Sequence, residues 1–251
     1  KSLIQEKDNE WDIKIMPQMG GECPWNFLSK NDPLRQRFIT KLQQQPDIWF
    51  QITVPNEFQP IGKFNVGVTA GIETDIFPHN FIEGMNKMNL NLVSSNHSKK
   101  VALSTTFDRI DKNTKQKTGS SLKLEKPCEV LFEGLDLDKY FKIQNPKSTI
   151  LKDIPESFCF LYTGHWLPGI IGEDRKNTGL MIKTFLETFS GPSNKKPALI
   201  LKTNEVNYSI LDRESIIKRI NHIKNQIKGN IPNIYLLHGE MTDEEMNLLN
   251  N

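Results

Sequence analysis

The stretch FLYTGHWLPGIIGEDRKNTGLMIKTF, residues 160–185, decides how the chain is interpreted. It begins as an apolar strand, breaks at Gly164, and resumes a helical pattern near Asn177, directly after Arg175 and Lys176. The glycine-rich fingerprints GxGxxG and GxxxxGK[ST] do not occur in it. Ligands of open parallel α/β sheets bind beyond the carboxyl ends of the strands, and Gly164 follows such an end. The sequence therefore predicts a ligand site at this turn.

Similar apolar, β-branched runs recur along the chain and alternate with segments of helical period. This alternation predicts parallel sheets built from βαβ units, and hence an α/β fold. Several runs are apolar nearly throughout, as expected of strands that are buried on both faces. The expected strands are Asp12–Met16, Ile48–Val54, Phe64–Thr69, Leu90–Ser94, Glu129–Phe132, Phe158–Thr163, Ala198–Lys202 and Asn233–Leu237.

Capping residues mark the starts of several expected helices. Ser94 or Ser95 can cap a helix over Ser98–Leu103, and Thr242 with Glu245 makes a capping box before a last helix. Apolar residues at helical spacing predict the longer helices. These are a short helix at Phe81–Met88, a helix opening near Asn177 with Met181, Ile182, Phe185, Leu186 and Phe189 on one face, and a helix that Asp212 could cap, with Ile216, Ile220, Ile223 and Ile227 on one face.

Two polar segments interrupt the alternation. Residues 105–128 are Lys-rich and too poor in apolar residues for a core element, so we expect a surface excursion such as a hairpin. The proline- and charge-rich stretch 138–156 is typical of an inter-domain linker. Together with the length of 251 residues, this predicts two domains, 1–150 and 151–251.

Composition excludes several classes of protein. The chain has 32 Lys and Arg against 30 Asp and Glu, without a basic arm, which is unlike a protein devoted to nucleic acid. No apolar run reaches the roughly 20 residues that a membrane span requires. Cys23, Cys128 and Cys159 lie far apart and form no CxxC pair, which indicates thiols in a reducing compartment. We therefore expect a cytoplasmic protein.

The turn at Gly164 predicts the binding of an anion. A helix presents free N–H groups and about half a positive charge at its N-terminus. Cations oppose this dipole, so Arg175 and Lys176 at a helix start make sense if an anion arrives between them. A diphosphate fits best, because the dipole and the cations can hold it without a metal. The alternative is an ordinary solvated helix start.

The ordered motifs resemble the GT-B glycosyltransferases of the family-4 type. The string YTGHWLP…RKNTGLMIKTFLETF is similar to the segment that opens the donor domain of that family. The string VGVTAGIETDIFPHNFIEGMN resembles the acceptor-domain strand and loop that face the donor. Further matches in the family's order are LNLVSSNHSKKV, EVLFEGLDLDKYF, PALILKT and NIYLLHGEMTDEEMNLL.

This resemblance implies two Rossmann-like domains, both incomplete. The first acceptor-domain strand would precede Lys1, and the family's E-x7-E region would follow Leu249. The implied activity is transfer of a sugar from a nucleoside-diphosphate sugar, UDP- or GDP-linked, to a hydroxyl of a glycan, lipid or protein. The resemblance further implies retention of the anomeric configuration and no metal or other cofactor. The absence of a spanning segment still allows peripheral contact with a membrane.

The resemblance also assigns candidate residues. Lys176 would hold the donor diphosphate, and His165 replaces the family's usual arginine, so that Arg175 can supply this charge. Glu73 would bind a sugar hydroxyl, although an ordinary loop carboxylate explains it equally well. Glu73 and Lys176 are therefore the candidate catalytic residues. The remaining candidates are Gly164, Lys202, Gly239, Glu240 and Met241 on the donor side, and Thr69 and Thr74 on the acceptor side.

Other interpretations stay open. Nucleotide-sugar epimerases and glycogen-phosphorylase-like enzymes use the same fold, and a non-catalytic sugar-nucleotide or glycan-binding module would share its binding groups. The triplet Asp136-Leu137-Asp138 spells the DxD metal motif of another transferase fold, but its place after EVLFEGL favours a structural role. Among the five histidines we expect only His165 in the site, and we expect no metal site.

Overall fold

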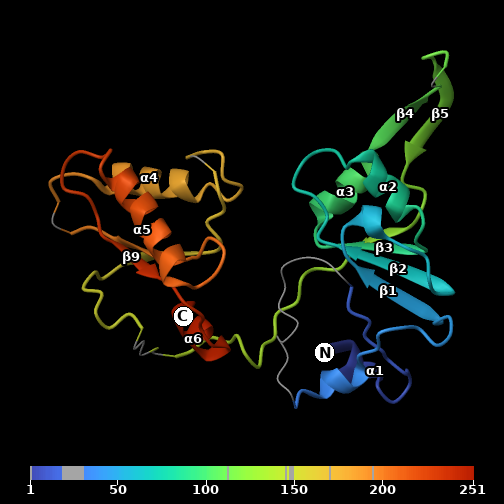
Figure 1. The fold of residues 1–251 in the computed structure, drawn as a ribbon, viewed down its shortest axis with the longest axis horizontal. Coiled ribbons are helices and arrows are strands. Elements are labelled where there is room, and N and C mark those ends of the chain that lie inside the picture. Colours follow the sequence, from blue (N-terminus) through green and yellow to red (C-terminus); the bar gives the residue numbers. More distant parts are fainter. Residues whose placement is uncertain are drawn as a thin grey trace. The chain divides into compact units, whose positions relative to one another are not determined.

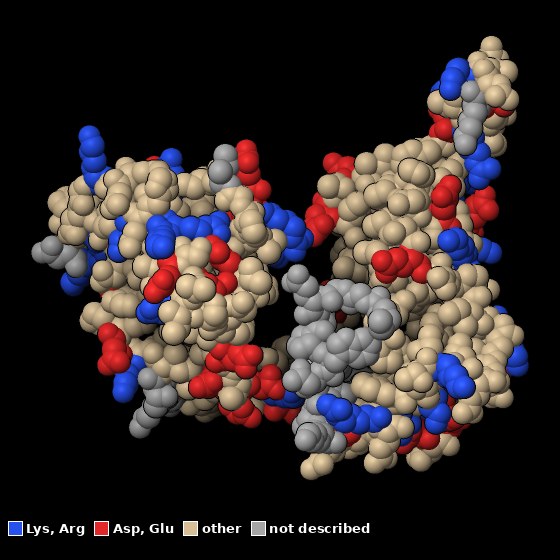
Figure 2. Space-filling view, in the orientation of Figure 1, with Lys and Arg blue, Asp and Glu red and all other residues tan. Residues whose placement is uncertain are grey.

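The computed structural model describes residues 2–18, 31–111, 113–144, 146, 150–169, 171–193 and 195–251. The chain divides into two compact units, Lys1–Gly134 and Leu135–Asn251, and Figure 1 labels most of their helices and strands. Each unit contains a parallel sheet flanked by helices, which confirms an α/β fold of the Rossmann-like class. Acidic and basic side chains are interspersed on the face of each unit that Figure 2 shows, in keeping with the nearly balanced charge.

The division between the units falls earlier in the chain than the boundary expected near residue 150. The expected linker belongs in part to the second unit, because it is bonded to the last helix, α6 (Asp243–Leu249). Lys139 forms an ion pair with Asp243, and the N–H of Phe141 donates to Asn247 Oδ1 at 3.2 Å. Residues 139–141 are therefore part of a packed unit.

The first unit is built on four parallel strands in the order β1-β2-β3-β6. In this register Phe50 of β1 pairs with Val66 of β2, which pairs with Leu90 of β3. Helices α2 and α3 cover one face, and the core there includes Phe58, Phe77 and Met85. The element bounds are α1 (Ser2–Lys7), η1 (Pro33–Arg37), β1 (Ile48–Ile52), η2 (Pro55–Glu57), β2 (Phe64–Thr69), α2 (His79–Met85), β3 (Leu90–Val93), α3 (Asn96–Ser104) and β6 (Cys128–Val130).

The Lys-rich excursion is a hairpin, as expected. Strands β4 (Thr106–Ile110) and β5 (Lys117–Lys123) pair antiparallel and extend away from the rest of the first unit in Figure 1. Phe107 and Leu122 pack against the core, whereas most other hairpin side chains are exposed. The base of the hairpin is therefore anchored, and its tip is solvated.

The second unit is a three-stranded parallel sheet in the order β7-β8-β9. All five residues of β8 are buried, as expected for a continuous apolar run. Strands β7 and β9 are only partly buried, because each pairs on one side within the described residues. The expectation of full burial was wrong for these two strands. The bounds are β7 (Cys159–Thr163), α4 (Thr178–Phe189), β8 (Ala198–Lys202), α5 (Ile210–Lys224) and β9 (Ile234–Leu237).

Capping contacts set the ends of the helices. The hydroxyl of Ser95 accepts the N–H of Ser98 at the start of α3, and Thr242 and Glu245 form the predicted capping box of α6. The cap of α5 is Ser209 and not Asp212, which lies within the first turn. The predicted helix caps are thus confirmed for α3 and α6, and wrong for α5.

Three other findings bear on the predictions from sequence: the segment Asp12–Met16, the cysteines and the character of the helices. Segment Asp12–Met16 is not a strand, since Ile15 makes only an isolated bridge to Phe38. Cys128 and Cys159 are free thiols, and burial raises the pKa of Cys128 to about 11. Cys23 lies outside the described residues. Among the helices that the structure describes, none has the length and apolar character to cross a lipid bilayer.

Candidate functional site

The carboxyl edge of the second sheet brings together three of the predicted donor-side residues. The N–H of Gly164, after β7, donates to the carbonyl of Lys202, at the end of β8, at 3.1 Å. The Lys202 ammonium in turn donates to the carbonyl of Gly239, after β9. Because the strands are parallel neighbours, their ends meet at one edge.

Lys202 is a buried lysine without a carboxylate in direct contact. It is 8% exposed, and its ammonium lies 5.0 Å from the centroid of the Tyr208 ring. Burial lowers the pKa of Lys202, and the charge of Glu240 offsets only part of this effect. Among the described residues no acidic side chain forms an ion pair with it. Within the described residues, the direct partners of its ammonium group are therefore a carbonyl group and an aromatic ring.

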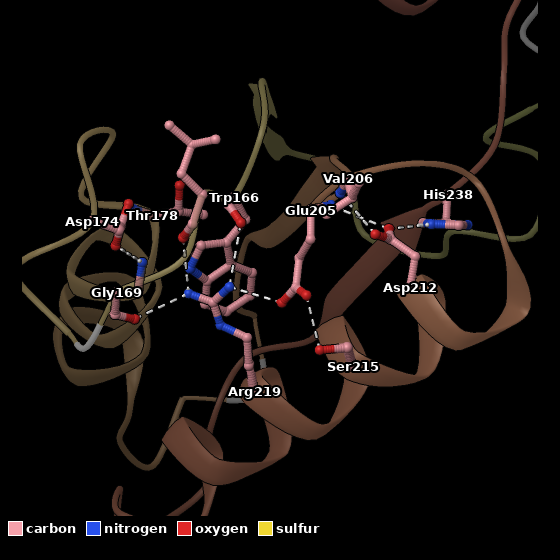
Figure 3. Close-up of polar contacts among 12 residues, drawn as sticks. Trp166, Gly169, Asp174, Thr178, Glu205, Val206, Asp212, Ser215, Arg219 and His238 are labelled. Atoms are coloured by element: carbon pink, nitrogen blue, oxygen red, sulfur yellow. Dashed lines mark hydrogen bonds and ion pairs between the residues drawn. The ribbon is translucent and has the colours of Figure 1, made fainter. Parts of the chain in front are cut away.

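The N-terminus of α4 differs from the expectation. The predicted free N–H groups are already bonded, because the Asp174 carboxylate accepts the N–H of Thr178 at 2.9 Å and that of Gly179 at 3.4 Å. Asp174 is 2% exposed, and Figure 3 shows it facing the start of the helix. Asn177 has φ of 51°, in the left-handed region, and its N–H donates to the Asp174 carbonyl at 2.8 Å. The anion at this helix start is thus a side chain of the protein itself.

Arg175 and Lys176 lie on the same turn, and neither forms an ion pair with Asp174. Both residues are exposed, and within the described part of the chain neither forms an ion pair. They remain on the loop that precedes α4, where the sequence placed them. No described contact joins either of them, or His165 or Met241, to Lys202.

The Gly164 turn is linked to α4 through Tyr162. The Tyr162 hydroxyl lies 2.8 Å from Thr178 Oγ1 and donates to the carbonyl of His165 at 3.4 Å. A Cβ atom on residue 164 would lie 3.1 Å from the same hydroxyl. Room for the Tyr162 hydroxyl therefore favours a small residue at position 164, independent of any ligand.

A buried Asp–His pair lies on the same sheet edge and was not predicted. His238 Nε2, after β9, is 2.9 Å from Asp212 Oδ2, and each side chain is 4% exposed. Asp212 also accepts the N–H groups of Glu205 at 3.1 Å and Val206 at 2.8 Å, as Figure 3 shows. Burial raises the pKa of Asp212, but these hydrogen bonds outweigh it and the pKa is lowered. Asp212 therefore holds the loop after β8.

Arg219 of α5 holds the loop after β7. Its guanidinium stacks on the Trp166 ring at 4.1 Å and forms an ion pair with Glu205 at 2.8 Å. It also donates to the carbonyls of Trp166 at 3.2 Å and Leu167 at 3.3 Å. These contacts, drawn in Figure 3, tie the β7 and β8 loops together. No sequence pattern marks Arg219, because its partners Glu205, Trp166 and Leu167 are distant from it in the sequence.

The first unit has an open pocket of about 460 Å³ at the carboxyl edge of its sheet. The pocket places the predicted residue Glu73 beside Ser94 and His97, which follow β3. Thr69 and Thr74 do not line it. The Thr69 hydroxyl accepts the N–H of Gly71 at 3.4 Å, and the Thr74 hydroxyl donates to a carbonyl. The lining residues are Ala70, Ile72, Glu73, Ser94, Ser95, His97, Ser98 and Glu133.

His97 is a site residue that the sequence analysis missed. Its Nε2 lies 3.2 Å from the carbonyl oxygen of Thr74. A carbonyl can only accept, so Nε2 carries the hydrogen in this contact. The expectation that, among the histidines, only His165 lies in the site stays a prediction. The available signal was the position of His97 in the first turn of the helix that follows β3.

One wall of the pocket depends on Gly71. This residue has φ of 85°, and a Cβ atom there would lie 2.2 Å from Ser98 Oγ. The Ser98 hydroxyl donates to the Ile72 carbonyl at 3.2 Å and accepts the Ile72 N–H at 3.1 Å. The loop after β2 thus lies directly on the first turn of α3.

Comparisons of the chain with models of protein families, with curated proteins and with solved structures find no match. Among the described residues, no three His, Cys, Asp or Glu side chains are grouped so that they could hold a metal ion. Asp136 accepts the N–H of Asp138 at 3.2 Å in a local turn, which accounts for the DxD triplet in structural terms. The two carboxyl edges therefore supply the geometry from which a function can be inferred.

Proposed function

We propose that the chain is a glycosyltransferase of the GT-B type. In this proposal the second unit binds a nucleoside-diphosphate sugar and the first unit binds the acceptor. One observation carries it: two parallel α/β units in one chain each bear candidate polar residues at the carboxyl edge of their own sheet. Ligands of open α/β sheets bind at this edge, and a transfer reaction needs two binding sites.

Cations would hold the donor diphosphate. Since Asp174 already occupies the first turn of α4, the phosphate charge would be met mainly by Lys176, Arg175 and Lys202. A charge-assisted hydrogen bond contributes about 1.5–3 kcal/mol, and more as charge develops on the leaving diphosphate. Gly239 and Glu240 would lie near the nucleotide, because they follow β9 beside Lys202.

The transfer would proceed without a metal and with retention. The cations stabilise the leaving diphosphate, and one of its oxygens takes the proton of the acceptor hydroxyl on the same face of the sugar. Glu73 would orient that hydroxyl from the pocket of the first unit. The glycosidic bond to phosphate breaks as the bond to the acceptor oxygen forms, so nucleoside diphosphate is released.

The test is the release of nucleoside diphosphate from UDP- and GDP-sugars in a coupled assay. We expect Lys176→Ala to reduce turnover about 100-fold, because one preorganised charge is lost. The matched control is Lys195→Ala, since Lys195 is also exposed but precedes β8 and lies toward the opposite edge of the sheet. Full turnover in Lys176→Ala would remove this lysine from the mechanism.

Other results would favour the alternatives. Donor binding without turnover by any acceptor would favour a sugar-nucleotide-binding module. A donor whose sugar changes configuration while it stays attached to the nucleotide would favour an epimerase.

A further inference from the structure

The hairpin β4–β5 carries the excess positive charge of the whole chain. Residues 106–126 contain six Lys or Arg and three Asp or Glu, which gives a net charge of +3, whereas the complete chain has a net charge of +2. Outside this segment the positive and negative side chains therefore nearly cancel. Figure 2 shows basic side chains on the hairpin, which extends away from the rest of the first unit.

The acidic groups near the end of the hairpin are bonded within it. Asp108 forms an ion pair with Lys117 at 2.5 Å. The Asp111 carboxylate accepts two N–H groups of its own turn, at 2.9 and 2.7 Å. In contrast, Arg109 and Lys115 are exposed, and neither forms an ion pair among the described residues. The end of the hairpin therefore presents positive charge to a partner.

Two further residues distinguish this end from an ordinary solvated turn. Lys115 has φ of 58°, in the left-handed region, where glycine or asparagine is usual. Ile110 is 60% exposed and lies directly opposite Lys117 in the ribbon. Stability and solubility alone would favour a glycine at the first position and a polar residue at the second. The end of the hairpin thus combines an apolar side chain with unpaired cations.

The base of the hairpin is fixed, so its end is presented in a defined direction. The Asn86 side chain, after α2, donates to the Lys123 carbonyl at 2.8 Å and accepts the N–H of Glu125 at 2.8 Å. The hairpin arises between the end of α3 and the start of β6. Because α3 begins after the carboxyl end of β3 and runs back, the hairpin arises at the amino edge of the sheet. It is therefore separate from the pocket at the carboxyl edge.

Among anionic partners, a lipid bilayer matches these residues best. Five of the six cations are lysines, whose flexible ammonium groups suit a diffuse plane of charge, whereas arginine suits paired contacts with a single phosphate. Single-stranded nucleic acid stacks its bases on exposed aromatic rings. The one aromatic residue of this segment, Phe107, packs against the core. An exposed isoleucine beside cations can instead enter the interfacial region of a bilayer.

We propose that the end of the β4–β5 hairpin is a docking site for an anionic lipid surface. Arg109 and Lys115 meet the lipid headgroups, and Ile110 enters the interface. With few cations and one apolar side chain the attachment is reversible. It does not depend on the proposed transfer reaction, because the hairpin contributes no residue to either carboxyl edge.

The test is co-sedimentation of the full chain with phosphatidylcholine vesicles, prepared with and without phosphatidylglycerol. We expect binding only to the anionic vesicles, and weaker binding at raised ionic strength. The double variant Arg109→Gln, Lys115→Gln should weaken this binding about 25-fold, since each cation near an anionic bilayer strengthens it about fivefold. Ile110→Ser should weaken it about fivefold through the lost apolar contact.

Matched controls come from exposed residues of the second unit. Lys195→Gln with Lys228→Gln makes the same change in net charge and should weaken binding less than about twofold, because the charge lost lies away from the hairpin. Ile210→Ser removes an isoleucine that is 76% exposed and should have no effect.

Five results would overturn the proposal. They are no binding to anionic vesicles, equal binding to vesicles of phosphatidylcholine alone, equal losses in the two double variants, displacement by inorganic phosphate at constant ionic strength, and tighter binding of single-stranded RNA than of anionic vesicles. Vesicle binding is measured without nucleotide. Its failure is therefore distinct from failure of the proposed transferase, which is judged by release of nucleoside diphosphate.

Discussion

The carboxyl edges of the two sheets differ in the partners of their acidic side chains. In the second unit the carboxylates of Asp174 and Asp212 accept backbone N–H groups, and Glu205 is paired with Arg219. In the first unit Glu73 and Glu133 line an open pocket and form no ion pair within the described residues. Both sheets are parallel. At the edge of the second sheet these carboxylates are bonded within the protein, whereas at the edge of the first sheet the two carboxylates line an open pocket.

This difference shows that the carboxyl edge of a parallel sheet does not by itself make a ligand-binding site. What a ligand can use are the groups that the protein leaves unmatched. In the second unit these are the exposed cations Arg175 and Lys176, which form no ion pair among the described residues. In the first unit they are acceptors. The groups left without an ion pair therefore differ in charge between the two edges.

The largest effect is expected from breaking the internal network of the second edge. Asp212→Ala leaves His238 and the N–H groups of Glu205 and Val206 without their shared acceptor. Removal of one partner of a buried pair costs about 3–5 kcal/mol, so the second unit should lose most of its stability. Hydrogen exchange of the β8 and β9 amides measures this loss.

The matched control for this change is Glu214→Ala, which removes an exposed carboxylate from the same helix. It should change protection by less than about 0.5 kcal/mol. Equal exchange in the two variants would show that the Asp212 network does not support the edge. Protection in β1 and β2 of the first unit should stay unchanged in both.

A smaller effect is expected when the pocket wall of the first unit is disturbed. Gly71→Ala adds both a strained φ and a clash with Ser98, and should cost about 2–4 kcal/mol. Gly119→Ala is the control, because Gly119 also has positive φ, 77°, but no atom within 4 Å of the added Cβ. Thermal unfolding of the two variants separates the clash from the backbone strain. Identical losses would mean that the loop after β2 is not fixed on α3.

The smallest effect is a pH dependence confined to the second edge. The pKa of Asp212 lies below its ordinary value of 3.8, so its contribution to stability is complete above that value and is lost as pH falls through the lower pKa of the folded state. Asp212→Asn removes this titration. Hydrogen exchange of β8 between about pH 2.5 and 5 should therefore show a difference between wild type and variant that shrinks toward acid. A constant difference across this range would contradict the assignment.

The regular elements could be predicted from the sequence, because they depend on local pattern. The run Ala198–Lys202 is β8 itself, the polar excursion is the β4–β5 hairpin, and Thr242 with Glu245 caps α6 as expected. Asp12–Met16 failed as a strand, since an apolar alternation needs a neighbouring strand and Ile15 finds only an isolated bridge.

The site was predicted less well, because its contacts join residues that are distant in sequence. Lys202, Gly164 and Gly239 do meet, as the parallel strand order requires. The role of Asp174 could not be predicted, since it depends on the left-handed turn at Asn177. His97 looked isolated because its pocket partner Glu73 belongs to another loop.

By itself the sequence determined the α/β class, the order of most strands along the chain and the caps of α3 and α6, because hydrophobic period and capping act over a few residues. Only the tertiary structure decided which charged side chains are paired within the protein and which have no internal partner. The reason is that a hydrogen bond or ion pair between separate loops, such as Asp212 with His238, exists only once the sheet has brought the strand ends together.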